Sequence, residues 1–144
     1  MGEVVLRALV EQSPVLAGHA AVSSAGTANW DVGQPMDQRA AAALKRAGFF
    51  GDGPVAQFAS RDYLDRQDLV VVMTREHRSD VLARRTRDGE VILLRSLLDD
   101  GLDLDLADPY YGDDATFDLC LDTIIRSCRE LVRGRLLEGA TFEA

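Results

Sequence analysis

The chain has 144 residues, of which 47% are hydrophobic and 28% are charged, so it suits one compact domain and excludes a disordered or fibrous protein. Its formal net charge of −8 disfavours a protein that binds nucleic acid by neutralising phosphates. No apolar run approaches the ~18 residues of a membrane helix. We therefore expect a cytoplasmic protein that does not span a membrane.

The first half of the chain alternates helical and strand-like segments. Apolar residues at helical spacing predict a helix over residues 1–10, and the β-prone run 19–24 predicts a short strand. A polar loop that contains Trp30 follows. The alanine-rich stretch 37–47 predicts a second helix, which Gly48 ends.

The second half begins with a continuous apolar run over residues 69–73, which is typical of a strand buried on both faces. The remaining predicted elements are a polar helix over 76–87, a strand over 91–94, an acidic loop over 98–112, and a long helix from Asp113 or Asp114 to about Leu137. Buried strands that alternate with helices predict an α/β fold with a doubly wound parallel sheet, in a single domain over residues 1–144.

The string Asp-Pro-Tyr-Tyr-Gly at residues 108–112 is the most informative motif. A residue before proline is held in an extended conformation, so Asp108 lies on a stiff loop. Such a loop is suited to aim a general acid at a leaving oxygen. The alternative is an acidic loop that ends in a turn and has no chemical role.

Three motifs in the same order resemble the low-molecular-weight protein tyrosine phosphatases. Residues 108–133 are similar to the end of that family, in which Asp-Pro-Tyr-Tyr-Gly precedes an acidic residue and a long helix. Residues 22–27 are similar to its second strand and the turn after it. Trp30 and residues 33–40 are similar to the wall of its substrate slit and the helix start that follows. The resemblance covers essentially the whole chain and implies a flavodoxin-like fold, with three strands here where the family has four.

The resemblance also implies a reaction and the residues that support it. A cysteine thiolate attacks phosphorus while an aspartic acid protonates the leaving phenol, and the same aspartate then activates water. The implied substrate is a phosphotyrosine protein or a small aryl phosphate, with no metal or organic cofactor. The implied roles are Asp108 as general acid and base, Trp30, Tyr110 and Tyr111 as the walls of the substrate slit, and Ser24, Asp37 and Arg39 as structural support.

One part of the family pattern is expected to be missing from this chain. The family begins with a strand and a Cys-x5-Arg-Ser-Pro loop, and residues 1–7 resemble the segment that follows this loop. The nucleophile would then be absent. Either the reading frame is truncated, or the protein is a catalytically inactive remnant with a binding or regulatory role. In the family arrangement the missing strand lies between residues 20–24 and 69–73, so their open edges favour self-association. Arsenate reductase is a further alternative, but residues 2–119 contain none of the cysteines that its disulfide relay needs.

The cysteines of this chain are Cys120 and Cys128, both in the predicted final helix. Eight helical residues rise about 12 Å, whereas a disulfide needs Cα atoms within roughly 7 Å, so the two cannot pair with each other. Residues 120–127 fit Cys-x5-Arg-Ser literally. They contain no glycine and follow helical spacing, so we expect both cysteines to be packing residues.

Overall fold

The computed structural model describes residues 1–51 and 53–138, so the end of the predicted domain, residues 139–144, lies outside the described residues. Helices and short strands alternate along the chain. The elements are α1 (Gly2–Gln12), α2 (Gln38–Arg46), α3 (Arg61–Asp65), β1 (Val70–Val72), α4 (Arg75–Arg84), β2 (Val91–Leu93), the 3-10 helices η1 (Leu94–Leu98) and η2 (Pro109–Tyr111), α5 (Asp114–Leu131) and the π-helical turn η3 (Val132–Leu136).

The sheet of the described residues is a parallel pair, with Val70, Val71 and Val72 of β1 opposite Val91, Ile92 and Leu93 of β2. The prediction of a third strand over residues 19–24 is wrong, because that segment forms no ladder of backbone hydrogen bonds with another strand. It makes a single parallel bridge, between Gly26 and Phe58. A strand is defined by its pairing, and β1 does not lie close enough to pair with this segment, since a cavity lies between the two.

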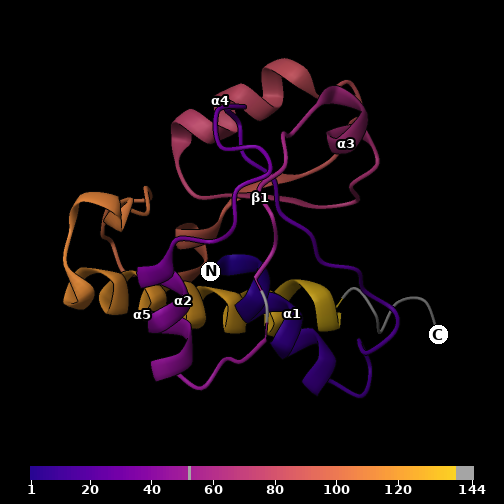
Figure 1. Cartoon of the computed structure of the whole chain (residues 1–144). Coiled ribbons are helices and arrows are strands. Elements are labelled where there is room, and N and C mark those ends of the chain that lie inside the picture. The colour runs from indigo at the N-terminus through magenta and orange to yellow at the C-terminus, as the bar shows by residue number, and fades with distance from the viewer. Residues whose placement is uncertain (52, 139–144) are drawn as a thin grey trace.

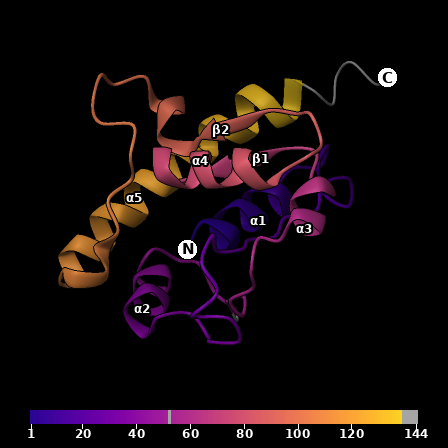
Figure 2. The ribbon, with the colours of Figure 1, turned by 90° about the horizontal axis from the view of Figure 1, so that it is seen from above.

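The helices lie in two layers around β1. Helices α3 and α4 cover one face, while α1 and α5 lie on the other with α2 beside α5 (Figure 1). The view from above shows α4 lying across β1 and β2 (Figure 2). Each layer has its own apolar cluster. One contains Val5, Ala43, Leu121 and Ile124 of α1, α2 and α5, and the other contains Leu64, Val70, Val81 and Val91 of α3, α4 and the sheet.

Local sequence accounts for the ends of the two helices that flank the site. The Asp37 side chain accepts a hydrogen bond from the backbone N–H of Arg39 and caps α2. Gly48 follows α2 with φ +88°, a left-handed conformation in which glycine is favoured, and this ends the helix as predicted. Asp113 caps α5 by accepting from the N–H of Thr116.

Two details differ from the sequence prediction. Helix α3 was not predicted, because five residues are too few to show a helical period; its start is the Ser60 cap, which accepts from the N–H of Tyr63. The long last helix is regular only to Leu131, after which the chain continues as the π-helical turn η3.

Candidate active site

The loop before α5 holds Asp108 in a defined position. Asp108 is extended, with φ −72° and ψ 122°, and Pro109 follows it at the start of η2. Its Oδ1 accepts a hydrogen bond from the N–H of Tyr110 at 3.0 Å. Oδ2 of Asp108 accepts no hydrogen bond from any residue in 1–51 or 53–138, and the side chain is exposed. The carboxyl group is therefore fixed by one oxygen and open to solvent through the other.

Gly112 lets this loop turn directly into α5. A Cβ atom at residue 112 would lie 2.6 Å from the Cβ of Thr116, so a side chain there would collide with the first turn of the helix. The next residue, Asp113, is the cap of α5. Hydrogen bonds from the backbone and side chain of Thr116 lower the pKa of Asp113. The loop is thereby attached rigidly to the N-terminus of α5.

The two adjacent tyrosines present an aromatic surface next to Asp108. Their ring centroids are 5.0 Å apart and the rings are nearly perpendicular, at 86°. Tyr111 is 96% exposed and Tyr110 is 57% exposed. Tyrosines this exposed contribute little to the core, so their rings are available to a ligand.

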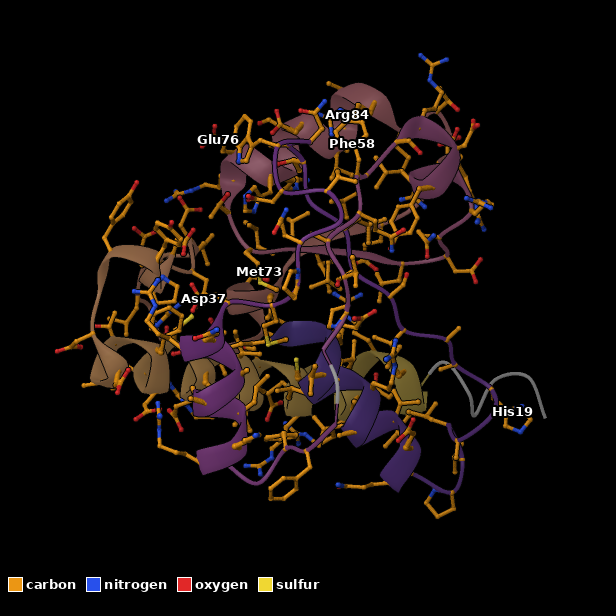
Figure 3. The ribbon with its side chains drawn as sticks, in the orientation of Figure 1. His19, Asp37, Phe58, Met73, Glu76 and Arg84 are labelled. Carbon is orange, nitrogen blue, oxygen red and sulfur yellow. The ribbon has the colours of Figure 1, made fainter. Side chains whose placement is uncertain are left out.

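Arg39 joins α2 to this loop. Its guanidinium donates hydrogen bonds to Asp37 at 3.0 and 3.2 Å and to the carbonyl of Gly112 at 3.3 Å. The same group lies 4.7 Å from the ring centroid of Phe117 and 5.4 Å from that of Tyr110. The Arg39 hydrogen bonds lower the pKa of Asp37, which is therefore held as a carboxylate. Asp37 and Arg39 fix the loop from the side of α2, where Asp37 is labelled in Figure 3.

Trp30 lies in a separate turn, and its side chain is 82% exposed. Within residues 1–51 and 53–138, no ring contact connects it to Tyr110 or Tyr111. Contacts among the described residues thus join Asp37 and Arg39 to the tyrosine loop, whereas no ring contact joins Trp30 to its tyrosines.

Arg84 of α4 anchors the segments around Trp30, and no sequence motif indicates this role. Its guanidinium donates to the carbonyl oxygens of Thr27 at 2.7 Å and Ala59 at 3.3 Å, and lies 4.7 Å from the ring centroid of Phe58. Figure 3 shows Arg84 and Phe58 together. The partners are 25 and 57 residues away in sequence, so no local pattern could have indicated the contact.

Ser24 lies in the extended segment that leads to this turn and lines the cavity beside β1. Its carbonyl oxygen accepts a hydrogen bond from Nε2 of Gln57 at 2.8 Å.

Comparison with known proteins identifies the group to which this arrangement belongs. A family model described as low molecular weight phosphotyrosine protein phosphatase matches residues 1–140. The chain belongs to this family. It is 35% identical to a low molecular weight protein-tyrosine-phosphatase of Streptomyces coelicolor, over 94% of this chain and 88% of that protein. It is 28% identical to the human low molecular weight phosphotyrosine protein phosphatase, over 90% of this chain and 82% of that protein.

Solved structures show the same fold. YfkJ from Bacillus subtilis superposes with a TM-score of 0.82 at 26% identity, over 95% of this chain and 86% of that one. A protein tyrosine phosphatase from Entamoeba histolytica superposes with a TM-score of 0.85 at 23% identity, over 96% of this chain and 88% of that one. The predicted flavodoxin-like α/β fold of the phosphatase family is confirmed.

The cysteines of this family member are not placed for nucleophilic attack. Cys120 and Cys128 both lie within the continuous helix α5, and so does the whole string that fits Cys-x5-Arg-Ser. Burial raises the pKa of the Cys120 thiol and raises that of Cys128 to about 11. Both are therefore neutral thiols near pH 7, whereas the thiolate is the nucleophilic form.

Residues 1–51 and 53–138, which the structure describes, show neither a cluster of metal ligands nor a membrane-spanning helix. They contain no group of three or more His, Cys, Asp or Glu side chains that could hold a metal ion. None of their helices is long and apolar enough to cross a membrane.

Proposed function

We propose that Asp108 is the general acid and base of a phosphotyrosine phosphatase reaction. A cysteine thiolate would attack phosphorus and break the bond to the aryl oxygen, which takes the electron pair while Asp108 gives it a proton. The Asp108 carboxylate would then take a proton from water as that water attacks the phosphocysteine, which releases phosphate and regenerates the thiolate. The substrate class is a phosphotyrosine protein or a small aryl phosphate.

The position of Asp108 is the observation that carries this proposal. In a chain of this family, one exposed carboxyl oxygen that accepts no hydrogen bond from the described residues stands at the start of a stiff loop, directly before two exposed tyrosine rings. A proton donor next to an aromatic surface suits a phenol as the leaving group. Trp30 is proposed as a second aromatic wall, and Ser24, Asp37 and Arg39 as structural support.

The nucleophile is the part that these residues do not supply. The proposal requires a cysteine in a Cys-x5-Arg loop close to Asp108, and neither Cys120 nor Cys128 lies in such a loop. For the chain as printed we therefore expect no hydrolysis of nitrophenyl phosphate above buffer. Robust turnover that disappears in Cys120→Ser would show instead that a helical cysteine acts as the nucleophile.

The role of Asp108 is tested in a chain to which a strand and a Cys-x5-Arg-Ser-Pro loop are joined ahead of Met1. Asp108→Asn should slow hydrolysis of phenyl phosphate by about 10²–10⁴-fold, the range for loss of a general acid. The loss should be smaller for nitrophenyl phosphate, whose leaving group needs less help from a proton. Asp105→Asn is the matched control, because Asp105 is in the same acidic loop and pairs with Arg75. An equal loss with both substrates would contradict proton donation by Asp108.

Cys120 and Cys128 lie in a helix and are not placed as nucleophiles, which favours a second function: binding of an aryl ligand without hydrolysis. The aromatic surface of Tyr110 and Tyr111 does not depend on a nucleophile. A titration of the chain as printed with phenyl phosphate, compared between the unmodified protein and Tyr111→Ala, tests whether the tyrosines bind the aryl group. Binding without turnover in the chain that carries the added loop would favour this second function.

A further inference from the structure

A groove of about 280 Å³ runs between α2 and α5, which lie side by side (Figure 1). Its floor is apolar, with Ala43 and Ala47 on the side of α2 and Leu121 and Ile125 on the side of α5. Ala43 and Leu121 are buried, whereas Ala47 is exposed and Ile125 is partly exposed. The short alanine side chains leave the space open. A volume of this size suits a ligand with one ring, since pockets for drug-sized ligands begin at about 300 Å³.

The rim of the groove is charged. Arg46 of α2 donates two hydrogen bonds to Oδ1 of Asp118, at 2.7 and 3.1 Å, so an ion pair joins the two helices across the groove. Asp122 follows Asp118 by one helical turn, so both carboxylates lie on the same side of α5. Arg126 donates to Oδ2 of Asp122 at 3.0 Å. Oδ2 of Asp118 and Oδ1 of Asp122 accept no hydrogen bond from residues 1–51 and 53–138, so each carboxylate keeps one oxygen open to a ligand.

The charges that line the groove favour a cation. Arg46, Asp118 and Asp122 are its charged lining residues, so two carboxylates face one guanidinium. The hydrogen bond to Asp118 raises the pKa of Arg46, and the nearby charge of Asp114 adds to this effect. Asp114 lies one turn before Asp118 on α5 and extends the row of carboxylates. A ligand with one positive charge would therefore balance the lining of the groove, whereas an anion would be repelled.

We propose that this groove binds a small organic cation that has one flat apolar ring and an amidinium group. The ring would lie on the apolar floor, and the cation would donate to the open oxygens of Asp118 and Asp122. An amidinium suits this place because it carries donors on two nitrogen atoms, and charged donors form strong hydrogen bonds with carboxylates. The groove lies about two turns of α2 away from Arg39. It is therefore separate from the Asp108 loop, and the proposal does not depend on the phosphatase reaction.

The probes are three ring compounds of the same shape: benzamidine is a cation, benzamide is neutral and benzoate is an anion. Binding to the unmodified chain is followed by the shifts of backbone amide signals in nuclear magnetic resonance spectra. In low salt we expect benzamidine to bind with a Kd of about 1 mM and about fivefold more tightly than benzamide, with benzoate the weakest. The shifts should fall in residues 43–47 and 118–125. Equal binding of benzamidine and benzamide, or shifts confined to other residues, would overturn the proposal.

A charge variant tests the role of the carboxylates. Asp122→Asn removes a negative charge from the groove, whereas Asp62→Asn removes one from an exposed position of α3 that does not line it. Asp122→Asn should bring the affinity for benzamidine close to that for benzamide and leave benzamide unchanged. Asp62→Asn should change neither affinity. Salt of about 1 M should act like Asp122→Asn, because it screens exposed charges. A preference for benzamidine that persists in full in Asp122→Asn would refute the assigned contact.

A second pair of variants tests the location. Ala47→Phe places a ring in the groove, whereas Ala83→Phe adds the same ring at an exposed position of α4 that does not line it. Ala47→Phe should abolish binding of benzamidine and Ala83→Phe should leave it unchanged, with circular dichroism as the check that both variants fold. If Ala47→Phe does not fold, the comparison of the three probes on the unmodified chain still decides. Unchanged binding in a folded Ala47→Phe would place the ligand elsewhere and contradict the proposal.

Discussion

Replacing Arg39 should loosen the connection between α2 and the Asp108 loop. The guanidinium contacts Asp37, the Gly112 carbonyl and the rings of Tyr110 and Phe117 at the same time. Arg39→Ala removes all of these contacts, whereas Arg39→Lys keeps the charge but loses the planar fork that makes them together.

The size of the effect follows from the surroundings of each contact. The ring of Phe117 is buried, so the cation–π contact contributes about 1 kcal/mol. The hydrogen bond to Gly112 is long, at 3.3 Å, and contributes roughly 1 kcal/mol, below the usual value for a charged donor. The ion pair with Asp37 is about one-third exposed on each side and contributes about 0.5 kcal/mol. Arg39→Ala should therefore lower the free energy of unfolding by about 2–3 kcal/mol.

Urea unfolding followed by far-ultraviolet circular dichroism measures this loss. Fluorescence is unsuitable because the single tryptophan, Trp30, is already exposed in the folded chain. Arg46→Ala is the matched control: Arg46 is in the same helix and pairs with Asp118 across to α5, but both side chains are exposed, so its loss should cost at most about 1 kcal/mol. Equal destabilisation by Arg39→Ala and Arg46→Ala would refute the reasoning.

Three further changes have defined outcomes. Asp113→Ala removes a helix cap and should lower the free energy of unfolding, measured with urea, by about 1 kcal/mol. Hydrogen bonding lowers the pKa of Asp113 in the folded chain. The difference in stability between the unmodified chain and Asp113→Ala should therefore fade as the pH drops below about 3.9 toward that lower pKa. Leu121→Ala should cost about 2–5 kcal/mol in the same assay because the side chain is buried, whereas the exposed Leu119→Ala should change little. Alkylation by iodoacetamide at pH 8, followed by mass spectrometry, should be roughly a hundredfold slower at Cys128 than at an ordinary cysteine, since its pKa is about 11 against 9.0; equal rates would contradict its burial.

The sequence predicted the elements that carry a local signal. Helix α1, the capped helix α2 and the apolar strand β1 all have a period, a cap or a continuous run that a short window reveals. The segment 19–24 has the composition of a strand, but its state depends on whether another strand pairs with it, and composition does not record that.

In the candidate site too, the sequence indicated the residues with a local pattern and not the contacts between distant residues. The motif at 108–112 was visible, because Pro109 and Gly112 restrict the backbone at fixed offsets from Asp108. The reach of Arg39 to Gly112, 73 residues further on, was not visible. Arg84 was missed for the same reason, since its partners are carbonyl oxygens, which every residue has.

The cavity beside β1 also affects how the fold can open. It lies between part of the apolar cluster around α1, α2 and α5 and part of the cluster around α3, α4 and the sheet, and the two meet at β1, where Val71 and Met73 pack against the first cluster. Cooperative unfolding relies on continuous packing, so a gap between two clusters allows one to open while the other stays closed. We expect amide hydrogens in α3 and α4 to exchange with deuterium through partial openings during which α1 and α5 remain protected. The Asp108 loop, which is attached to α5, would keep its geometry throughout those openings.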